Sequence, residues 1–256
     1  MIIAEANSRL KQLISTSRSH VGSGTDVPFL GFEYDAAAAA LMEITLQHAE
    51  AFYELAKCDE RFFFAAASCA RSAKEAAVTL AWICHPKEKI EKEGRWLGYY
   101  DGLAKFHANM ARELGKVDPE IPKEMDLLNK FHGEVRNRTI AGKLIPIVAK
   151  PSMEQMMISL GYRELYTSYR ELCHILHIGP EMVWRFKQGV KFDNGLSGFR
   201  IAQRTLGGEW EIPFLAIGWS VALSVIATLV ELGDSTANLR PVHDAQKALT
   251  DYVKNV

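Results

Sequence analysis

The chain has 256 residues, of which 48% are hydrophobic and 24% are charged, so it can bury a sizeable core. Its 30 basic residues balance 31 acidic ones and give a net charge of -1, which excludes an overall basic surface for nucleic acid or anionic membranes but permits a local basic patch. The four cysteines form no C-x-x-C pair, and the charged N-terminal segment does not have the pattern of an export signal. We therefore expect buried thiols and a cytoplasmic protein.

The apolar residues of the N-terminal half recur with a helical period, and alternation of period two is nearly absent. Asp35 is the expected N-cap of one helix, and His85-Pro86 should end the next because the residue before proline disfavours the helical conformation. A Gly/Ser-containing loop is expected at 20–31. The helices predicted in this half cover 2–17, 35–57, 59–84 and 87–114, followed by a break at 115–122 and a shorter helix to about 138.

The C-terminal half begins with a proline-containing connector at 145–151. One uninterrupted helix is predicted from 152 to 177. The segment 186–212 is the least helical part, and its Asp193-Asn194-Gly195 turn favours a long loop or a short hairpin. Two final helices are predicted at 213–232 and 238–253.

The segment from Pro213 to Val230 contains no charged residue, so by length alone it could span a membrane. Gly218 and several hydroxyl side chains dilute its hydrophobicity, and no basic cluster flanks it. We expect the central buried helix of a bundle and no membrane contact, with a membrane span as the alternative. The predicted fold is an all-α, irregular multi-helix bundle forming a single domain over 1–256, with an N-terminal helix and loop at 1–34, the main bundle at 35–235 and a C-terminal helix at 236–256.

Arg71 and Glu75 are the first candidate site residues, because their i, i+4 spacing allows direct pairing on one helix face. If this face points inward, the pair costs desolvation and is typical of a site or of a packing-specificity element. If it points outward, the pair is an ordinary surface ion pair. The sequence leaves both interpretations open.

A second set of candidates lies at the end of the helix predicted to finish at His177. Glu171, His174 and His177 have a spacing compatible with metal ligation, but the Glu-x-x-His motif of di-iron bundles must occur twice and here occurs once. We therefore predict no metal and no cofactor. Arg170 and His177 instead suggest a guanidinium that holds a phosphate beside an imidazole that moves a proton. The alternative is that Arg170 pairs with a carboxylate while His177 complements the helix dipole.

A set of polar and aromatic residues is scattered through the middle of the chain, and it comprises Arg71, Glu75, Trp82, Arg95, Tyr169, Arg170, His177 and Pro180. With this set the chain resembles a bacterial family of helical proteins known as a domain of unknown function, over about residues 35–235. The resemblance implies that Arg71, Glu75, Tyr169 and His177 meet in one interior polar site.

A looser similarity is to the HEPN superfamily, helical bundles whose Arg-x4-6-His motif often belongs to RNA-cleaving proteins. It implies RNA as the partner, a homodimer, and Arg170 and His177 as catalytic residues of metal-independent cleavage in stress response or phage defence. Substrate binding would then involve Arg71, Glu75, Tyr169 and Arg95. A non-catalytic helical interaction module is the alternative hypothesis, and a metal-binding helical bundle is the second.

Overall fold

The computed structural model describes residues 2–21, 33–57, 62–114, 139–140, 142–176, 187–191, 197–201, 210–231 and 239–255, with isolated positions between 123 and 137. The helices are α1 (Ile2–Val21), α2 (Glu33–Lys57), α3 (Phe63–Cys84), α4 (Lys89–Leu114), α6 (Met153–Ser159), α7 (Leu165–Leu176), α9 (Glu211–Glu231) and α10 (Arg240–Lys254). The strands are β1 (Thr139–Ile140), β2 (Lys143–Leu144), β3 (Lys187–Lys191) and β4 (Ser197–Ile201).

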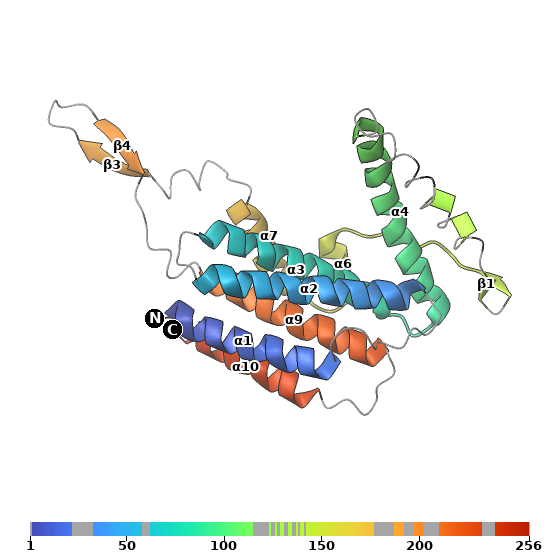
Figure 1. Ribbon diagram of the computed structural model, residues 1–256, viewed down its shortest axis with the longest axis horizontal. Coiled ribbons are helices and arrows are strands. Elements are labelled where there is room, and N and C mark those ends of the chain that lie inside the picture. The colour runs from blue at the N-terminus through green and yellow to red at the C-terminus, as the bar shows by residue number, and fades with distance from the viewer. Residues whose placement is uncertain are drawn as a thin grey trace.

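The chain folds as an all-α multi-helix bundle, as predicted. Helices α1, α2, α3, α9 and α10 lie along a common direction, whereas α4 leaves one end of the bundle at a steep angle (Figure 1). Helix α9 packs against α1, α2, α3, α7 and α10. The two ends of the chain lie close together at the opposite end of the bundle from α4 (Figure 1).

Helix α9 is the central apolar helix that the sequence predicts. Among the described helices it is the one long and apolar enough to cross a membrane, and 72% of its most apolar window is buried inside the bundle. Its hydroxyl side chains need no outside partner, because Ser220, Ser224 and Thr228 donate to carbonyl oxygens three or four residues earlier in the same helix. These internal hydrogen bonds allow a helix with polar side chains to lie in the core.

Small side chains let α3 approach its neighbours closely. Several of its alanines, including Ala66, Ala70 and Ala77, are completely buried where α3 packs against α2 and α9. Larger rings fill the space at one end of this layer: Phe52 and Phe63 pack edge-on against Trp210, with ring centroids 6.0 and 5.2 Å away. The core is therefore tight around α3, the helix that carries the first candidate site residues.

The start of α2 differs from the expectation. Asp35 is not the N-cap, because the helix already begins at Glu33. The buried carboxylate of Glu93, on α4, accepts hydrogen bonds from the backbone N–H groups of Glu33 and Tyr34 at 3.4 and 3.1 Å. An acceptor from a distant helix thus satisfies the first turn, which local sequence cannot reveal.

The single helix predicted from 152 to 177 is wrong, because the structure has two helices, α6 and α7. Helix α6 starts with a capping box of Ser152 and Gln155 and ends at Ser159, with Leu160 as its C-cap and Gly161 next at a positive φ of 79°. The N–H of Tyr162 bonds to the carbonyl of Met157 at 2.8 Å, and that of Gly161 bonds to Ile158 at 3.0 Å. This pair of bonds is the Schellman motif, which reverses the chain direction after α6.

Short strands occur at two places. Antiparallel pairing of β3 with β4, in which Lys187 faces Ile201, confirms the hairpin alternative within 186–212. The smaller pair β1–β2, adjoining Gly142 at a φ of 75°, is not expected from the sequence. Helix α1 extends to Val21, four residues beyond its predicted end. The predicted loop at 20–31 and the helix to about 138 fall largely outside the described residues.

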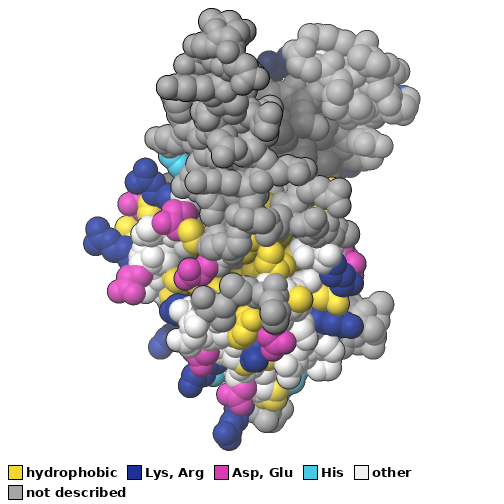
Figure 2. Space-filling model, turned by 90° about the vertical axis from the view of Figure 1, so that its left-hand side faces the viewer, with side chains coloured by type: hydrophobic (Ala, Val, Ile, Leu, Met, Phe, Trp, Pro, Cys, Tyr) yellow, Lys and Arg dark blue, Asp and Glu magenta, His cyan; other side chains and the backbone are white. Residues whose placement is uncertain are grey.

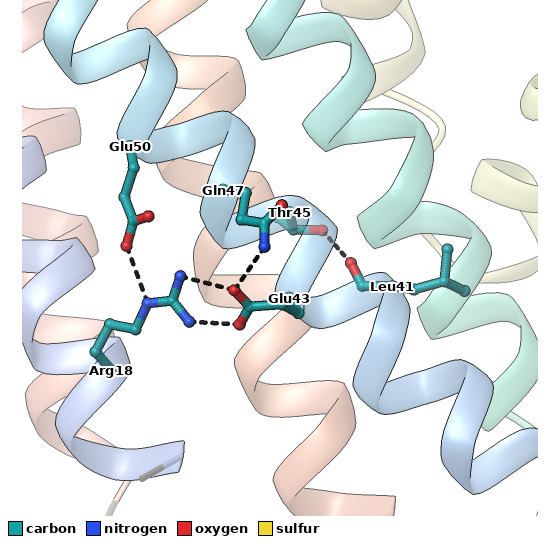
Figure 3. Close-up of polar contacts among 6 residues, drawn as sticks. All are labelled: Arg18, Leu41, Glu43, Thr45, Gln47 and Glu50. Carbon is teal, nitrogen blue, oxygen red and sulfur yellow. Dashed lines mark hydrogen bonds and ion pairs between the residues drawn. The ribbon is translucent and has the colours of Figure 1, made fainter. Parts of the chain in front are cut away.

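A polar cluster ties α1 to α2. Arg18 makes a bidentate contact with the carboxylate of Glu43, and its Nε donates to Glu50 at 3.0 Å (Figure 3). Gln47 also donates to Glu43 at 3.0 Å. The hydrogen bond from Arg18 is the main cause of a lowered pKa at Glu43, and the bond to Glu43 is the main cause of a raised pKa at Arg18. These contacts hold the N-terminal helix on the bundle.

Candidate functional site

The first candidate residues meet across the contact between α3 and α7. Glu75 Oε1 accepts a hydrogen bond from Arg71 Nε at 3.0 Å and a second from the Tyr169 hydroxyl at 2.7 Å. The guanidinium of Arg71 also lies 5.9 Å from the centroid of the Tyr169 ring. The side chains of Arg71 and Glu75 are 28% and 39% exposed. The pair is therefore neither fully solvated nor buried, and it lies where a ligand from solvent can reach it.

Electrostatics hold this cluster in one protonation state. Burial raises the pKa of Tyr169, and the hydrogen bond and negative charge of Glu75 raise it further, so the phenol keeps the proton that it donates. Burial opposes the charge of Arg71, but the nearby Glu75, Cys173 and Tyr169 outweigh this effect and raise its pKa. Arg71 is thus a permanent cation whose position is fixed by Glu75, while Tyr169 fixes Glu75.

Lys74 is a site-adjacent residue that the sequence analysis did not identify. Its side chain is 1% exposed, and its amine donates to the Leu165 carbonyl at 2.9 Å and to Ser168 Oγ at 2.5 Å. The amine also lies 5.4 Å from the ring centroid of Trp219. Burial lowers the pKa of Lys74 to about 8, against an opposing effect of Glu171. Lys74 anchors the first turn of α7 on α3, and the only signal in the sequence is a lysine on an alanine-rich helix face.

Lys150 brings another cation close to the cluster from the segment predicted to be a connector. It is exposed, its amine lies 4.9 Å from the ring centroid of Tyr99, and it is near enough to Glu75 for that charge to act on it. The surrounding protein nevertheless desolvates the amine and lowers its pKa, and Glu75 only partly offsets this. No helical or strand pattern marks residue 150, so its place beside the cluster is not predictable from local sequence.

Arg95, a predicted substrate-binding residue, contacts the last turn of α3. Its Nη1 donates to the carbonyl of Trp82 at 2.5 Å, and its guanidinium lies 5.2 Å from the Trp82 ring centroid. Desolvation lowers its pKa, with Glu91 acting in the opposite direction. The carbonyls of a last helical turn lack partners within the helix, so this bond caps α3. The contacts of Arg95 thus explain its role at the helix end, and substrate binding stays a prediction.

The predicted catalytic pair is only partly within the described chain. Arg170 is an exposed residue of α7, next to Tyr169, whereas His177 lies outside the described residues. Glu171 and His174 are also exposed on α7. Within the described part of the chain, which does not include His177, no group of three or more His, Cys, Asp or Glu side chains could hold a metal. Both the cleavage and the metal hypotheses therefore stay predictions.

The arrangement as a whole suits an anion with an aromatic or planar part. Arg71 and Lys150 supply exposed or half-exposed positive charge near the carboxylate of Glu75, and the buried Lys74, on which Glu171 also acts, adds to the local positive potential. The Tyr166 and Tyr169 rings are stacked, with centroids 6.1 Å apart. On the face drawn in Figure 2, basic and acidic side chains are intermixed over the described part of the chain. This intermixing agrees with the balanced composition of the chain.

Comparison with known proteins gives one result. A family model described as a family of unknown function (DUF5677) matches residues 35–195. This confirms the resemblance to a helical family of unknown function, over a shorter range than the 35–235 inferred from scattered residues. The matched range contains Arg71, Glu75, Lys150 and Tyr169. No curated protein and no solved structure matches the chain, and the similarity to the HEPN superfamily stays a prediction.

Proposed function

The chain belongs to this family of unknown function, DUF5677, and we propose that it binds a phosphate-bearing ligand, with RNA as the leading candidate, at the site formed by Arg71, Glu75, Tyr169 and Lys150. The observation that carries the proposal is the position of the Arg71 guanidinium, which is held by Glu75, stacked near Tyr169 and still 28% exposed. A permanent cation held in place loses little conformational entropy when it binds an anion.

The geometry leaves Arg71 suited to phosphate recognition. Its hydrogen bond to Glu75 uses Nε, so the two terminal amino groups carry the paired donors that match two phosphate oxygens. Glu75 accepts from both Arg71 and Tyr169 on the same oxygen, which fixes the guanidinium on α3 against α7. Glu75 and Tyr169 are therefore positioning residues, and Arg71 makes the contact with the ligand.

RNA is favoured over a bare phosphate because aromatic rings adjoin the cations. Tyr166 and Tyr169 are stacked, and Tyr99 lies beneath the amine of Lys150. An aromatic side chain that stacks on an unpaired base contributes about 1–3 kcal/mol, and single-stranded RNA offers such bases beside its phosphates. The local, rather than global, positive charge suits a short stretch of single strand rather than a long duplex.

The finer version of the proposal adds cleavage by Arg170 and His177. His177 would take the proton of a ribose 2′-hydroxyl, and the 2′ oxygen would attack the adjacent phosphorus while Arg170 stabilises the charge on the phosphate. The bond to the 5′ oxygen would break, and that oxygen would take a proton from water. The products would be a 2′,3′-cyclic phosphate and a 5′-hydroxyl, with no metal required.

The test separates binding from cleavage. Fluorescence anisotropy with labelled single-stranded and hairpin RNA in EDTA should show binding by the wild type and a loss of at least tenfold in Arg71→Gln. The matched control is Arg240→Gln, which replaces an exposed arginine of α10 that pairs with Asp244. This variant should bind RNA as the wild type does. Gel analysis of the same mixtures should show cleavage that His177→Ala abolishes while its binding persists. Equal binding by wild type and Arg71→Gln would refute the binding proposal.

A non-catalytic interaction module is the second candidate, and exposed apolar side chains favour it. Leu144 is 69% exposed, and Ile147 and Val148 in the same segment are also exposed. If the wild type binds no RNA and Arg71→Gln changes only stability, this candidate takes precedence. Replacement of Leu144 and Ile147 by Ser should then abolish the association with its protein partner while the melting temperature is kept.

A further inference from the structure

The segment from Ile145 to Lys150 packs with its backbone directly on α4. A Cβ added at Gly94 would lie 2.1 Å from the Pro146 carbonyl oxygen, and one added at Gly98 would lie 1.7 Å from that of Val148. The N–H of Val148 donates to the Gly94 carbonyl at 3.0 Å. Backbone atoms cannot move aside as a flexible side chain can, so any larger residue at either position must displace the segment. The two glycines lie one helical turn apart and form a seat for it.

This seat determines where Lys150 lies. Ile145 is buried at one end of the segment, and the contacts at Pro146 and Val148 fix the chain two residues before Lys150. On the helix side, Tyr99 directly follows Gly98, and the Lys150 amine lies over its ring at 4.9 Å. The contact of this segment with α4 therefore also brings the Lys150 amine to the region of the site where the charge of Glu75 acts on it.

We infer that Lys150 is the second phosphate-contacting residue of the site, and that Gly94 and Gly98 are positioning residues that place it opposite Arg71. This inference rests on the proposed function, and it specifies the ligand as a phosphate bound between two cations from different parts of the chain. Arg71 is held on α3 by Glu75, whereas Lys150 is delivered by the docked segment. Glu75 attracts both cations and compensates one positive charge, so the phosphate compensates the other.

Salt dependence of RNA binding tests the contact. Each phosphate contact that is lost makes the slope of log affinity against log salt less steep by about one, and it weakens binding independently of sequence. Lys150→Gln should raise Kd about tenfold at low salt and make the slope less steep by this amount, whereas Lys150→Arg should keep both Kd and slope near wild type. Lys143→Gln, an exposed lysine of the same region, is the matched control. Lys150→Gln with an unchanged slope and affinity would overturn the inference.

Positioning by the glycines has its own readout, which does not depend on RNA. Lysines dimethylated with carbon-13 can be titrated by NMR, with Lys150→Arg used to assign the Lys150 signal. The wild type should show a pKa for Lys150 below its ordinary value, and Gly98→Ala should return it toward that value and weaken RNA binding as Lys150→Gln does. Gly133→Ala, where an added Cβ meets nothing within 4 Å, should change neither. Gly94→Ala serves as the second variant if Gly98→Ala does not fold.

The two parts fail in different ways. A wild type that binds no RNA refutes the proposed function, while a Lys150 titration that responds to Gly98→Ala would still establish the positioning of the lysine. RNA binding that depends on Arg71 but not on Lys150 refutes the inference and leaves the proposed function standing. An unchanged Lys150 pKa in a folded Gly98→Ala variant refutes the role of the glycine seat.

Discussion

Lys74 allows the sharpest test of the electrostatics around the site. Its amine is buried between α3 and α7, and burial lowers its pKa from 10.5 to about 8. Below pH 8 the amine is charged in both the folded and the unfolded chain, and the folded protein bears the full desolvation cost. Between pH 8 and 10.5 the folded chain releases its proton first, so the unfolded chain binds more protons and the free energy of unfolding rises with pH.

The size of this effect follows from the shift. At about 1.4 kcal/mol per pH unit, a lowering from 10.5 to about 8 corresponds to about 3.5 kcal/mol, gained progressively across this window. The 1% exposure of Lys74 means that solvent screens little of it. Lys74→Met removes the titrating group while keeping a similar length, so this variant should lack that rise. The variant avoids the desolvation cost of the charged amine but loses the hydrogen bonds to Leu165 and Ser168. These two effects oppose each other, so the stability of the variant at pH 7 should stay within about 2 kcal/mol of wild type.

Urea denaturation at several pH values between 7 and 10.5 measures the prediction. Tyrosines, cysteines and the other lysines titrate in the same range, but their contributions cancel in the difference between wild type and Lys74→Met. Lys143→Met, in which an exposed lysine of β2 is replaced, controls for the general loss of one positive charge. If the difference between wild type and Lys74→Met is constant across this range, the amine is not desolvated in the folded protein and the reasoning fails.

Two further predictions concern the other polar clusters. Tyr169→Phe removes a hydrogen bond to the charged Glu75 and should lower the free energy of unfolding in urea by about 1–2 kcal/mol. The same change in a Glu75→Gln background should cost less, because the charged acceptor is already gone. Equal costs in both backgrounds would contradict the coupling. Arg18→Gln should cost about 1 kcal/mol at pH 7, because its contacts with Glu43 and Glu50 are only partly buried, and less in 1 M salt. Since the folded pKa of Glu43 is lowered, this stabilisation is complete above its unfolded value near 4.5 and is lost as pH falls through the folded pKa, so wild type and variant should converge in acid.

Local patterns in the sequence were sufficient for the parts of the fold that depend on local signals. The uncharged run after Pro213 predicts the central helix, and the turn-prone sequence Asp193-Asn194-Gly195 predicts the β3–β4 hairpin. The spacing of Arg71 and Glu75 predicts their hydrogen bond, because residues four apart on a helix are neighbours in any surroundings. The resemblance of the scattered polar residues to a helical family added Tyr169 as their partner from another helix.

Features that depend on distant contacts could not be predicted in this way. The break between α6 and α7 was missed because glycine is tolerated inside a helical pattern, and the positive φ of Gly161 is not visible in the residue type alone. The burial of Lys74 depends on its contact with α7, more than ninety residues later in the chain. Lys150 depends on the seat formed by Gly94 and Gly98, which looks like two weak positions in a helix until the segment that occupies it is known.

The charges around Glu75 help to distinguish a binding site from a packing element. A polar contact that only fixes packing needs no charge beyond what its own partners compensate, and excess charge in a partly desolvated place costs stability. Here burial lowers the pKa of both Lys74 and Lys150, and Glu171 and Glu75 offset this effect only partly, while Glu75 is already hydrogen-bonded to Arg71. A bound anion removes this cost, so ligand binding should stabilise the protein more at low salt than at high salt. Packing alone gives the opposite expectation, namely that replacing Lys150 by an uncharged residue improves stability and changes nothing else.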